Sequence, residues 1–322
     1  MKASSEQARA AKLQTLFAIF SGRETDREKL MALCSHFDAS EFNNEVLLRV
    51  EGAVAIVTLN RPEKMNTFSN ELMLGLGKAL AYVEDDDAVR CVVLTGNGRA
   101  FSAGGSLEKP HNALFSDKSK GPPPVQDAVR SLRNNMRATA QRLREMDKIT
   151  FAAINGACAG AGFSLACACD VRYCSEKAVF ATAFVNAGLS GDFGGTWTLP
   201  RIVGPAKARE LYLLSEKFRA PEAARIGLVS KVLPHDSMLE SVLATAAKAA
   251  AGPPLALRRI KANLNDADSV SWAEALDGEA DRHGRLSFSV DHVEAAKAFM
   301  EKRQGNFKGA GRTREPWELS RL

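Results

Sequence analysis

Two short turns of small residues and one isolated aspartate are the parts of this 322-residue chain whose types and spacing could do chemistry. The turn at residues 156–162 reads GACAGAG, with an apolar run of strand length before it and an apolar, helix-compatible run after it. A strand that enters a helix through such a turn leaves backbone N–H groups uncovered at the positive end of the helix dipole. We therefore expect the turn to attract negative charge, either a phosphate or an oxygen that becomes an anion during a reaction.

The same turn is also compatible with close packing or with dinucleotide binding. Small residues between a strand and a helix often serve only to let the two elements pack closely. A dinucleotide-binding fingerprint is conceivable because Gly160 and Gly162 form a GxG. Dinucleotide binding is the weaker interpretation of the two, since Leu165 stands where the third glycine of the fingerprint belongs. In addition, no acidic residue ends a second strand at a suitable distance.

Composition limits the class of protein. The chain is 45% hydrophobic, which suffices for one large core, or for one domain and an appendage. The net charge is +5, and no basic stripe alternates with aromatic residues, so we expect no nucleic-acid partner. No apolar run reaches the length of a membrane span, and the N-terminus lacks the apolar region of a signal peptide. We expect a cytoplasmic protein without a membrane segment.

The cysteines and histidines give no sign of a metal site. The six cysteines form no CxxC pair and several lie inside apolar runs, which is typical of buried free thiols in a reducing compartment. The five histidines are scattered, and none stands at metal-ligand spacing from a cysteine or an acid. We expect no bound metal.

Apolar periodicity predicts alternating strands and helices, and therefore an α/β fold with a parallel sheet. Two strands around a Glu51-Gly52 turn come first, and Ser69 is a plausible cap for the helix after them. A basic amphipathic helix precedes the central turn, and a glycine-rich loop follows it at 186–196. The predicted strands are 46–50, 54–60, 89–95, 149–155, 170–173 and 178–180; the predicted helices are 71–84, 127–146, 163–169 and a helical region from 205 to 303.

Four motifs in order resemble the crotonase (enoyl-CoA hydratase/isomerase) superfamily over roughly residues 44–308. They are LNRPEKMNTFS at 59–69, FSAGGS at 101–106, GACAGAG at 156–162 and GLSGDFGGTWTLPRIVG at 188–204. The resemblance implies an α/β spiral of ββα turns with a helical C-terminal region that mediates trimers, often paired into hexamers. It divides the chain into a helical N-terminal appendage at 1–43, a ββα spiral core at 44–250, and a C-terminal helical region and tail at 251–322.

The resemblance also implies a substrate and a set of contacts. Two backbone N–H groups, of Gly105 and Ala161 by position, would hold the carbonyl oxygen of an acyl-CoA thioester. Coenzyme A enters as part of the substrate, and no further cofactor is implied. The implied CoA-binding residues are Arg61, Lys64, Ala103, Phe288 and Lys302. For the three basic residues, a solvated surface charge is the competing interpretation.

The departures from the family pattern bear on the reaction. Hydratases of the family carry two glutamates that activate water and deliver a proton, and here Ser164 and Phe184 stand at those positions. Serine is no general base at neutral pH without a partner, and phenylalanine cannot act as one. The paired-glutamate mechanism of hydration is therefore disfavoured, and Ser164 and Phe184 remain as candidates for lining the substrate pocket.

Asp192 is the one acid in the right region, inside GLSGDFGG. Its motif looks most like that of the phenylacetate-pathway epoxide/oxepin-CoA isomerase-like members; dienoyl-CoA isomerases and 4-chlorobenzoyl-CoA dehalogenase also carry an aspartate here. The competing interpretation is a cap of the helix that starts near Gly194. Apolar Phe184, Phe193 and Trp197 nearby would raise the pKa of a catalytic aspartate and help it to take and return a proton.

Three functions follow in order of preference. The first is an enoyl-CoA isomerase in which Asp192 moves a proton between carbons. The second is an enoyl-CoA hydratase that uses Asp192 alone, and the third is a catalytically inactive acyl-CoA-binding protein. The expected partners are an acyl-CoA thioester and further copies of the same chain, as a homotrimer or hexamer.

Overall fold

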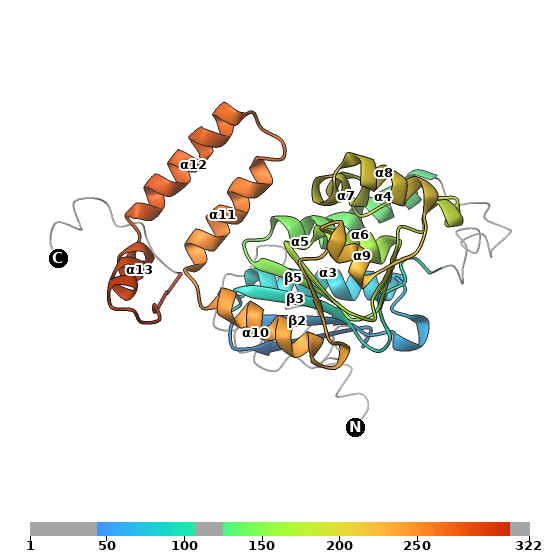
Figure 1. Cartoon of the computed structure of the whole chain (residues 1–322), viewed down its shortest axis with the longest axis horizontal. Coiled ribbons are helices and arrows are strands. Elements are labelled where there is room, and N and C mark those ends of the chain that lie inside the picture. The colour runs from blue at the N-terminus through green and yellow to red at the C-terminus, as the bar shows by residue number, and fades with distance from the viewer. Residues whose placement is uncertain (1–43, 107–124, 310–322) are drawn as a thin grey trace, which may run out of the picture. The chain divides into compact units, whose positions relative to one another are not determined.

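The computed structural model describes residues 44–106 and 125–309, which contain two β-sheets and the helices that cover them (Figure 1). The predicted N-terminal appendage and the end of the predicted C-terminal tail lie outside these residues. The strands are β1 Val46–Glu51, β2 Val54–Leu59, β3 Cys91–Gly96, β4 Ala100–Ser102, β5 Ile149–Ile154, β6 Ala157–Ala159, β7 Val171–Ser175, β8 Val179–Ala181, β9 Phe218–Arg219 and β10 Lys231–Leu233. The α-helices are α3 Asn70–Asp85, α4 Val125–Met136, α5 Arg142–Glu145, α6 Ala161–Ala168, α7 Gly195–Val203, α8 Pro205–Leu214, α9 Ala220–Arg225, α10 Met238–Ala250, α11 Pro254–Asp266, α12 Trp272–Ser287 and α13 Val290–Met300.

The larger sheet has six strands in the order β1-β2-β3-β5-β7-β10, parallel except for the β1–β2 hairpin. The smaller sheet has four strands in the order β4-β6-β8-β9, of which β4, β6 and β8 run parallel. Each strand of the larger sheet from β3 to β7 is followed by a short strand of the smaller one. The chain therefore climbs as a spiral that adds one strand to each sheet per turn, as the resemblance implied.

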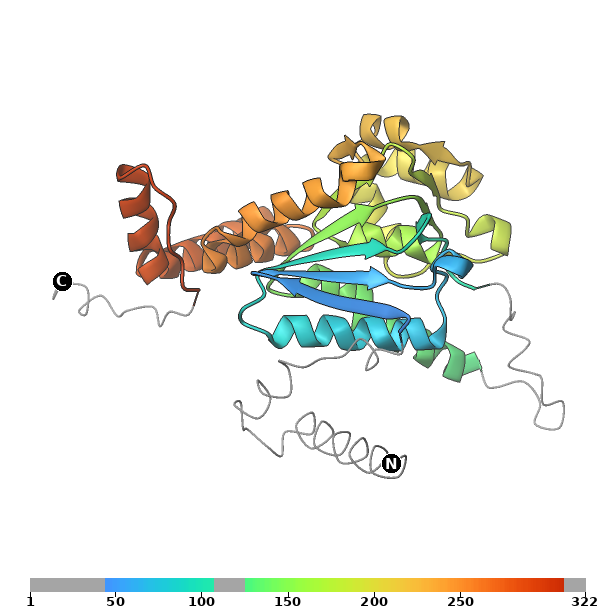
Figure 2. The same cartoon turned by 90° about the horizontal axis from the view of Figure 1, so that it is seen from below.

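Both faces of the larger sheet are covered, which explains why its strands are continuous apolar runs. On one face, Ile56, Val93 and Phe151 form a core cluster with Met238 and Val242 of α10. Successive side chains of a strand point to opposite faces, so the alternate residues of β2 lie on the face that packs against α3. In Figure 2, α3 runs in cyan along its face of the sheet.

Two glycines allow the chain to pass from the larger sheet to the smaller one. A Cβ atom on Gly96, at the end of β3, would lie 2.2 Å from the carbonyl oxygen of Ala100. A Cβ on Gly156, after β5, would lie 2.1 Å from the carbonyl oxygen of Arg99. Neither contact is tolerable for a methyl group, so the backbones approach closely only because both residues are glycine.

Most predicted elements are confirmed within one to three residues, with three differences. The Ser69 hydroxyl accepts from the Leu72 N–H at 3.0 Å and caps α3, as expected. The predicted helix at 127–146 is interrupted by a π-helical segment at Arg137–Gln141. The small-residue turn contains the short strand β6, and the predicted helical region from 205 to 303 contains β9 and β10.

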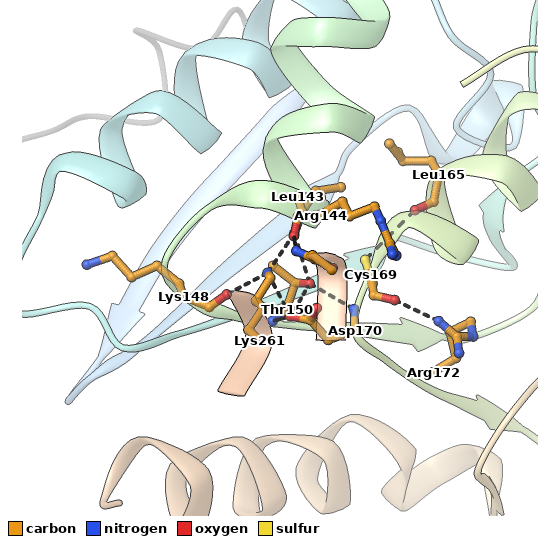
Figure 3. Close-up of polar contacts among 10 residues, drawn as sticks. Leu143, Arg144, Lys148, Thr150, Leu165, Cys169, Asp170, Arg172 and Lys261 are labelled. Carbon is orange, nitrogen blue, oxygen red and sulfur yellow. Dashed lines mark hydrogen bonds and ion pairs between the residues drawn. The ribbon is translucent and has the colours of Figure 1, made fainter. Parts of the chain in front are cut away.

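A buried lysine joins the C-terminal helices to the core (Figure 3). Lys261 of α11 is 5% exposed, and its ammonium group donates to the carbonyl oxygens of Leu143 and Lys148 at 3.0 and 2.9 Å. The third partner is the Asp170 carboxylate, at 2.8 Å. That carboxylate also accepts from the backbone N–H and the hydroxyl of Thr150. All three N–H groups of the lysine thus have acceptors, and Asp170 has a structural role in this network.

The thiols have the environment expected from the sequence. The five cysteines in the described ranges are free and buried. Burial raises the pKa of Cys167 and Cys169 to about 12, far from the thiolate form. None of the helices within residues 44–106 and 125–309 is long and apolar enough to cross a membrane.

Candidate active site

The first glycine loop leaves β4 and is held by the segment that precedes α3. The Phe68 N–H donates to the carbonyl of Gly104 at 2.8 Å, and Phe68 forms an isolated parallel bridge with Gly105. Gly104 has φ +90°, and a Cβ there would lie 2.8 Å from the Ala159 carbonyl and 3.0 Å from the Ala161 nitrogen. The first loop therefore touches the second one beside the Ala161 amide, and only glycine fits at the contact.

The second glycine loop starts α6. Gly160 has φ +53° and precedes Ala161, the first residue of the helix. Within the described part of the chain, neither the Ala161 N–H nor the Gly105 N–H donates a hydrogen bond, and a Cβ on Gly105 would meet open space. The two amides expected to hold an oxyanion thus lie on adjoining loops with their donors unused.

Close packing accounts for different glycines of the same turn. A Cβ on Gly162 would lie 2.6 Å from the Ser102 Cβ, because α6 packs directly against β4. Gly156 allows the backbone to pass from the larger sheet to the smaller one. Gly104 and Gly160 have backbone conformations that bring the free amides to one place. Gly156 and Gly162 are therefore required for close packing, whereas Gly104 and Gly160 shape the backbone around the two free amides.

Asp192 lies in the loop before α7 and does not cap that helix. The N-cap residue is Gly194, which has no side chain to accept a hydrogen bond, and only the backbone carbonyl of Asp192 is used, by the Gly195 N–H at 3.0 Å. The Oδ1 atom of Asp192 is buried and has no hydrogen-bond partner among the described residues. Burial raises the pKa of this carboxyl from 3.8 to about 6. The capping interpretation is therefore wrong.

An aromatic contact joins the Asp192 loop to the first glycine loop. Phe193 is 4% exposed and packs edge-on against Phe68, with ring centroids 5.4 Å apart. Phe68 is the residue that pairs with Gly104 and Gly105. A buried aromatic pair therefore connects the loop of Asp192 to the loop of Gly105.

The residues at the usual glutamate positions lie next to a tyrosine that the sequence did not indicate. Ser164 is fully buried, and its hydroxyl has no hydrogen-bond partner in the described part of the chain. Phe184 is 5% exposed and stacks on Tyr212 of α8, with ring centroids 5.9 Å apart and 10° between planes. A sequence signal did exist: Tyr212 follows buried Ala208 by one helical turn, and a tyrosine on a buried helix face needs a polar partner.

Trp197 does not join this apolar setting as expected. The residue is partly exposed, and two guanidinium groups lie over its ring, with the Arg201 Cζ 3.7 Å and the Arg144 Cζ 4.6 Å from the ring centroid. Asp268 forms ion pairs with both arginines. Trp197 therefore belongs to a cation–π cluster that links α7 to α5 and to the end of α11.

Three of the implied CoA-binding residues lie close to the first glycine loop. The Ala103 N–H donates to the Met65 carbonyl at 2.9 Å, next to the 3-10 helix Pro62–Lys64. Arg61 donates to the Thr67 carbonyl at 2.8 Å and pairs with Glu45 at 3.2 Å, so it is not the solvated surface charge of the competing interpretation. Lys64 is exposed at the end of the 3-10 helix.

Phe288 and Lys302 are not brought to this site within one chain. Phe288 caps the C-terminus of α12, and Lys302 follows α13. Both views show α13 on the far side of the core from α7 and α8 (Figures 1 and 2).

Known proteins resemble this chain along most of its length. The family model for enoyl-CoA hydratase/isomerase matches residues 49–310. The 1,2-epoxyphenylacetyl-CoA isomerase of Escherichia coli K12 is 35% identical over 82% of this chain and 98% of its own length. The crotonyl-CoA hydratase of Syntrophomonas wolfei is 33% identical over 81% and 97%, and a peroxisomal Δ(3,5)-Δ(2,4)-dienoyl-CoA isomerase of Arabidopsis thaliana is 34% identical over 80% and 93%.

Solved structures agree with these relatives. A putative enoyl-CoA hydratase from Streptomyces coelicolor A3(2) superposes with a TM-score of 0.77 at 34% identity, covering 83% of this chain and 94% of that one. A putative enoyl-CoA hydratase/isomerase from Mycobacterium abscessus gives 0.76 at 32% identity, over 82% and 100%. The two-sheet spiral, the paired glycine loops and these matches together show that the chain belongs to the enoyl-CoA hydratase/isomerase (crotonase) family.

Proposed function

We propose that this chain is an acyl-CoA isomerase in which Asp192 carries a proton between two carbons of an unsaturated or ring-bearing acyl group. The observation that carries the proposal is the Asp192 carboxyl itself, with its buried, unpartnered Oδ1 and a pKa that burial raises to about 6. A carboxyl with a pKa near the working pH can both accept a proton and return it. The isomerases of Escherichia coli and Arabidopsis among the relatives support the same reaction class.

In the proposed reaction, the thioester carbonyl oxygen accepts hydrogen bonds from the N–H groups of Gly105 and Ala161. The Asp192 carboxylate takes a proton from a carbon conjugated with that carbonyl, and the C–H electron pair moves toward the oxygen, which becomes an enolate. The protonated carboxyl then returns the proton to another carbon of the conjugated system, so that no atom is gained or lost. One N–H donor to an oxyanion is typically worth about 100- to 1,000-fold in rate.

Hydration of an enoyl-CoA is the alternative reaction, and the crotonyl-CoA hydratase of Syntrophomonas wolfei among the relatives supports it. Ser164 and Phe184 carry no carboxylate, so Asp192 alone would have to activate water and supply a proton. Isomerisation needs only one group that moves one proton, which is what the site offers. For that reason we prefer the isomerase.

We also infer that the working form is a homotrimer or hexamer. The helices α11, α12 and α13 carry large apolar side chains that are exposed in the single chain, among them Trp272 at 77% and Phe299 at 83%. Apolar surface of this kind usually marks an interface. In such an assembly, Phe288 and Lys302 of one copy would contact the CoA moiety bound by Arg61, Lys64 and Ala103 of another.

A panel of 2-enoyl, 3-enoyl and ring-containing acyl-CoAs in heavy water, read by mass spectrometry, tests the reaction. We expect substrate and product to gain deuterium without gaining the mass of water. Asp192→Asn should abolish this exchange and keep CoA-ester binding. Glu216→Gln, which removes an exposed carboxylate after α8, is the matched control and should change neither.

Three results would contradict the proposal. Full activity of Asp192→Asn would remove the aspartate from the reaction. Addition of water in place of isomerisation would favour the hydratase. Tight binding of the CoA esters with no exchange in the wild-type protein would favour an acyl-CoA-binding protein without catalytic activity.

A further inference from the structure

Three buried polar atoms without hydrogen-bond partners belong to the proposed proton carrier and to two residues packed against its loop. They are the Ser164 Oγ, the Tyr212 hydroxyl oxygen and the Asp192 Oδ1, and among the described residues only one further side-chain atom, the Arg142 Nε, shares this property. A buried polar atom without a partner loses its hydration and gains no hydrogen bond in return, so folded proteins rarely keep one without a reason. A cluster of three at one site therefore needs a physical cause.

Gly195 shows how close the two hydroxyl groups are. A Cβ atom on this glycine would lie 2.3 Å from the Ser164 Oγ and 2.3 Å from the Tyr212 hydroxyl oxygen. Two atoms so near the same point are close neighbours, and the glycine at the start of α7 is what lets them approach. Ser164 in turn lowers the pKa of the phenol, although no hydrogen bond of normal distance and angle joins the two groups.

The tyrosine ring lies against both ends of the turn that contains Asp192. Its Cε1 atom is 3.5 Å from where a Cβ of Gly191 would be, and its hydroxyl faces Gly195. The ring is also fixed by its stack with Phe184. The phenol is therefore held in one orientation, with its hydroxyl at the turn from which the carboxyl projects.

The electrostatic environment of the Tyr212 phenol agrees with this placement. Burial, the Cys167 thiol and the Asp192 carboxylate raise the pKa of Tyr212 to about 12, while Ser164 lowers it. Burial is the cause that acts on Asp192. At neutral pH the phenol keeps its proton, and it can donate that proton in a hydrogen bond to an ionised neighbour.

We propose that Tyr212 is a positioning residue for Asp192. The Tyr212 hydroxyl accepts a hydrogen bond from Ser164 and donates one to the Asp192 carboxylate when substrate fills the site. The inference rests on the proposed role of Asp192 as the proton carrier. Hydrogen bonds of catalytic groups are often long in a ligand-free protein and shorten when the substrate binds. The chain Ser164–Tyr212–Asp192 would aim the carboxylate at the substrate, and it would also satisfy all three unpartnered atoms.

Tyr212→Phe is the informative variant, because it keeps the stack on Phe184 and the contact with Gly191 and removes only the hydroxyl. Loss of a hydrogen bond to a charged group should lower kcat about 10- to 100-fold and leave KM nearly unchanged. The acidic limb of the kcat profile, which reports groups in the enzyme–substrate complex, should move to higher pH by about one unit, because the ionised carboxylate has lost a donor there. Tyr173→Phe, in the core cluster of the larger sheet, is the matched control and should leave the profile unchanged.

A direct titration separates this inference from the proposed function. In protein labelled with ¹³C at the aspartate carboxyls, the Asp192 resonance is assigned by its absence in Asp192→Asn and followed against pH in the presence of a CoA ester. We expect its midpoint to rise in Tyr212→Phe, and to rise less in Ser164→Ala. The rise of the midpoint in the double variant should not exceed the rise in Tyr212→Phe, since Ser164 acts through the tyrosine.

The outcomes are distinct. If Asp192→Asn stays active, the proposed function fails, while the titration still tests the contact. If Tyr212→Phe leaves the Asp192 midpoint unchanged, the inference is overturned, even where activity falls. If the shifts of the Asp192 midpoint in Ser164→Ala and Tyr212→Phe add independently in the double variant, the serine does not act through the tyrosine, and the proposed order of the contacts is wrong.

Discussion

Asp192→Asn should change the stability of the protein in a way that depends on pH. The folded protein raises the pKa of Asp192 from 3.8 to about 6, with burial as the cause, so the folded state binds this proton more tightly than the unfolded state does. Below about pH 4 the carboxyl is protonated in both states and costs nothing. As the pH rises through about 6, the folded state must carry a partly buried charge and is destabilised.

The size of the effect follows from the two pKa values. At about 1.36 kcal/mol per pH unit, the interval from 3.8 to about 6 sets an upper limit of about 3 kcal/mol. Part of the carboxyl is open to solvent, so we expect about 1–2 kcal/mol. The asparagine side chain has nearly the same shape but no charge, and it should remove this penalty at neutral pH.

Urea unfolding followed by circular dichroism, at several pH values between about 4.5 and 8, measures the difference. We expect the free energy of unfolding of Asp192→Asn to exceed that of the wild type at pH 8, with the gap closing toward pH 4.5. A gap that stays constant across this range would refute the reasoning, since an uncharged effect of the amide would then account for it. Asp170→Asn is a control of opposite sign, because it leaves the buried Lys261 ammonium without its anion and should destabilise by about 3–5 kcal/mol.

Three further predictions concern the loops, the buried lysine and the thiols. Gly104→Ala should lower turnover at least about 100-fold, because its Cβ would meet the second loop at a positive φ; Gly52→Ala, also at positive φ but facing open space, should keep full activity in the same assay. Lys261→Met should lower the midpoint of thermal unfolding and increase hydrogen exchange in α11, whereas unchanged exchange there would contradict the role assigned to the lysine. Cys158 and Cys167 should resist iodoacetamide in the native protein and react after unfolding, as peptide mapping would show, because burial raises the pKa of both thiols.

The sequence predicted the long elements well, because their signals are local. Continuous apolar runs marked β2, β3 and β5, and Ser69 marked the start of α3. Strands of two or three residues such as β6 and β9 are too short to show an alternation of apolar and polar residues. They form only because a neighbouring strand pairs with them. Such strands cannot be predicted without knowing which segments meet.

The sequence indicates the parts of the candidate site that depend on backbone and gives no sign of those that depend on tertiary contact. The glycine loops and Asp192 stand out in the sequence by composition. Whether Asp192 caps α7 could not be decided there, because capping depends on the backbone angles of Gly194. Tyr212 lies 20 residues from Asp192 in sequence and 48 from Ser164, and only the packing of α6, α7 and α8 brings the three together.

The contacts of Lys261 also bear on how motion can travel through the molecule. One ammonium group fastens α11 to the last turn of α5, to the start of β5 and to the Asp170 carboxylate just after α6. The first residue of that same short helix is Ala161, whose amide is one of the two proposed oxyanion donors. A displacement of the C-terminal helices, such as one caused by docking of another copy, would therefore be transmitted through Lys261 and Asp170 to the C-terminal end of α6. In the proposed assembly, the contact between copies and the position of the proposed oxyanion donors are therefore connected through a helix of eight residues.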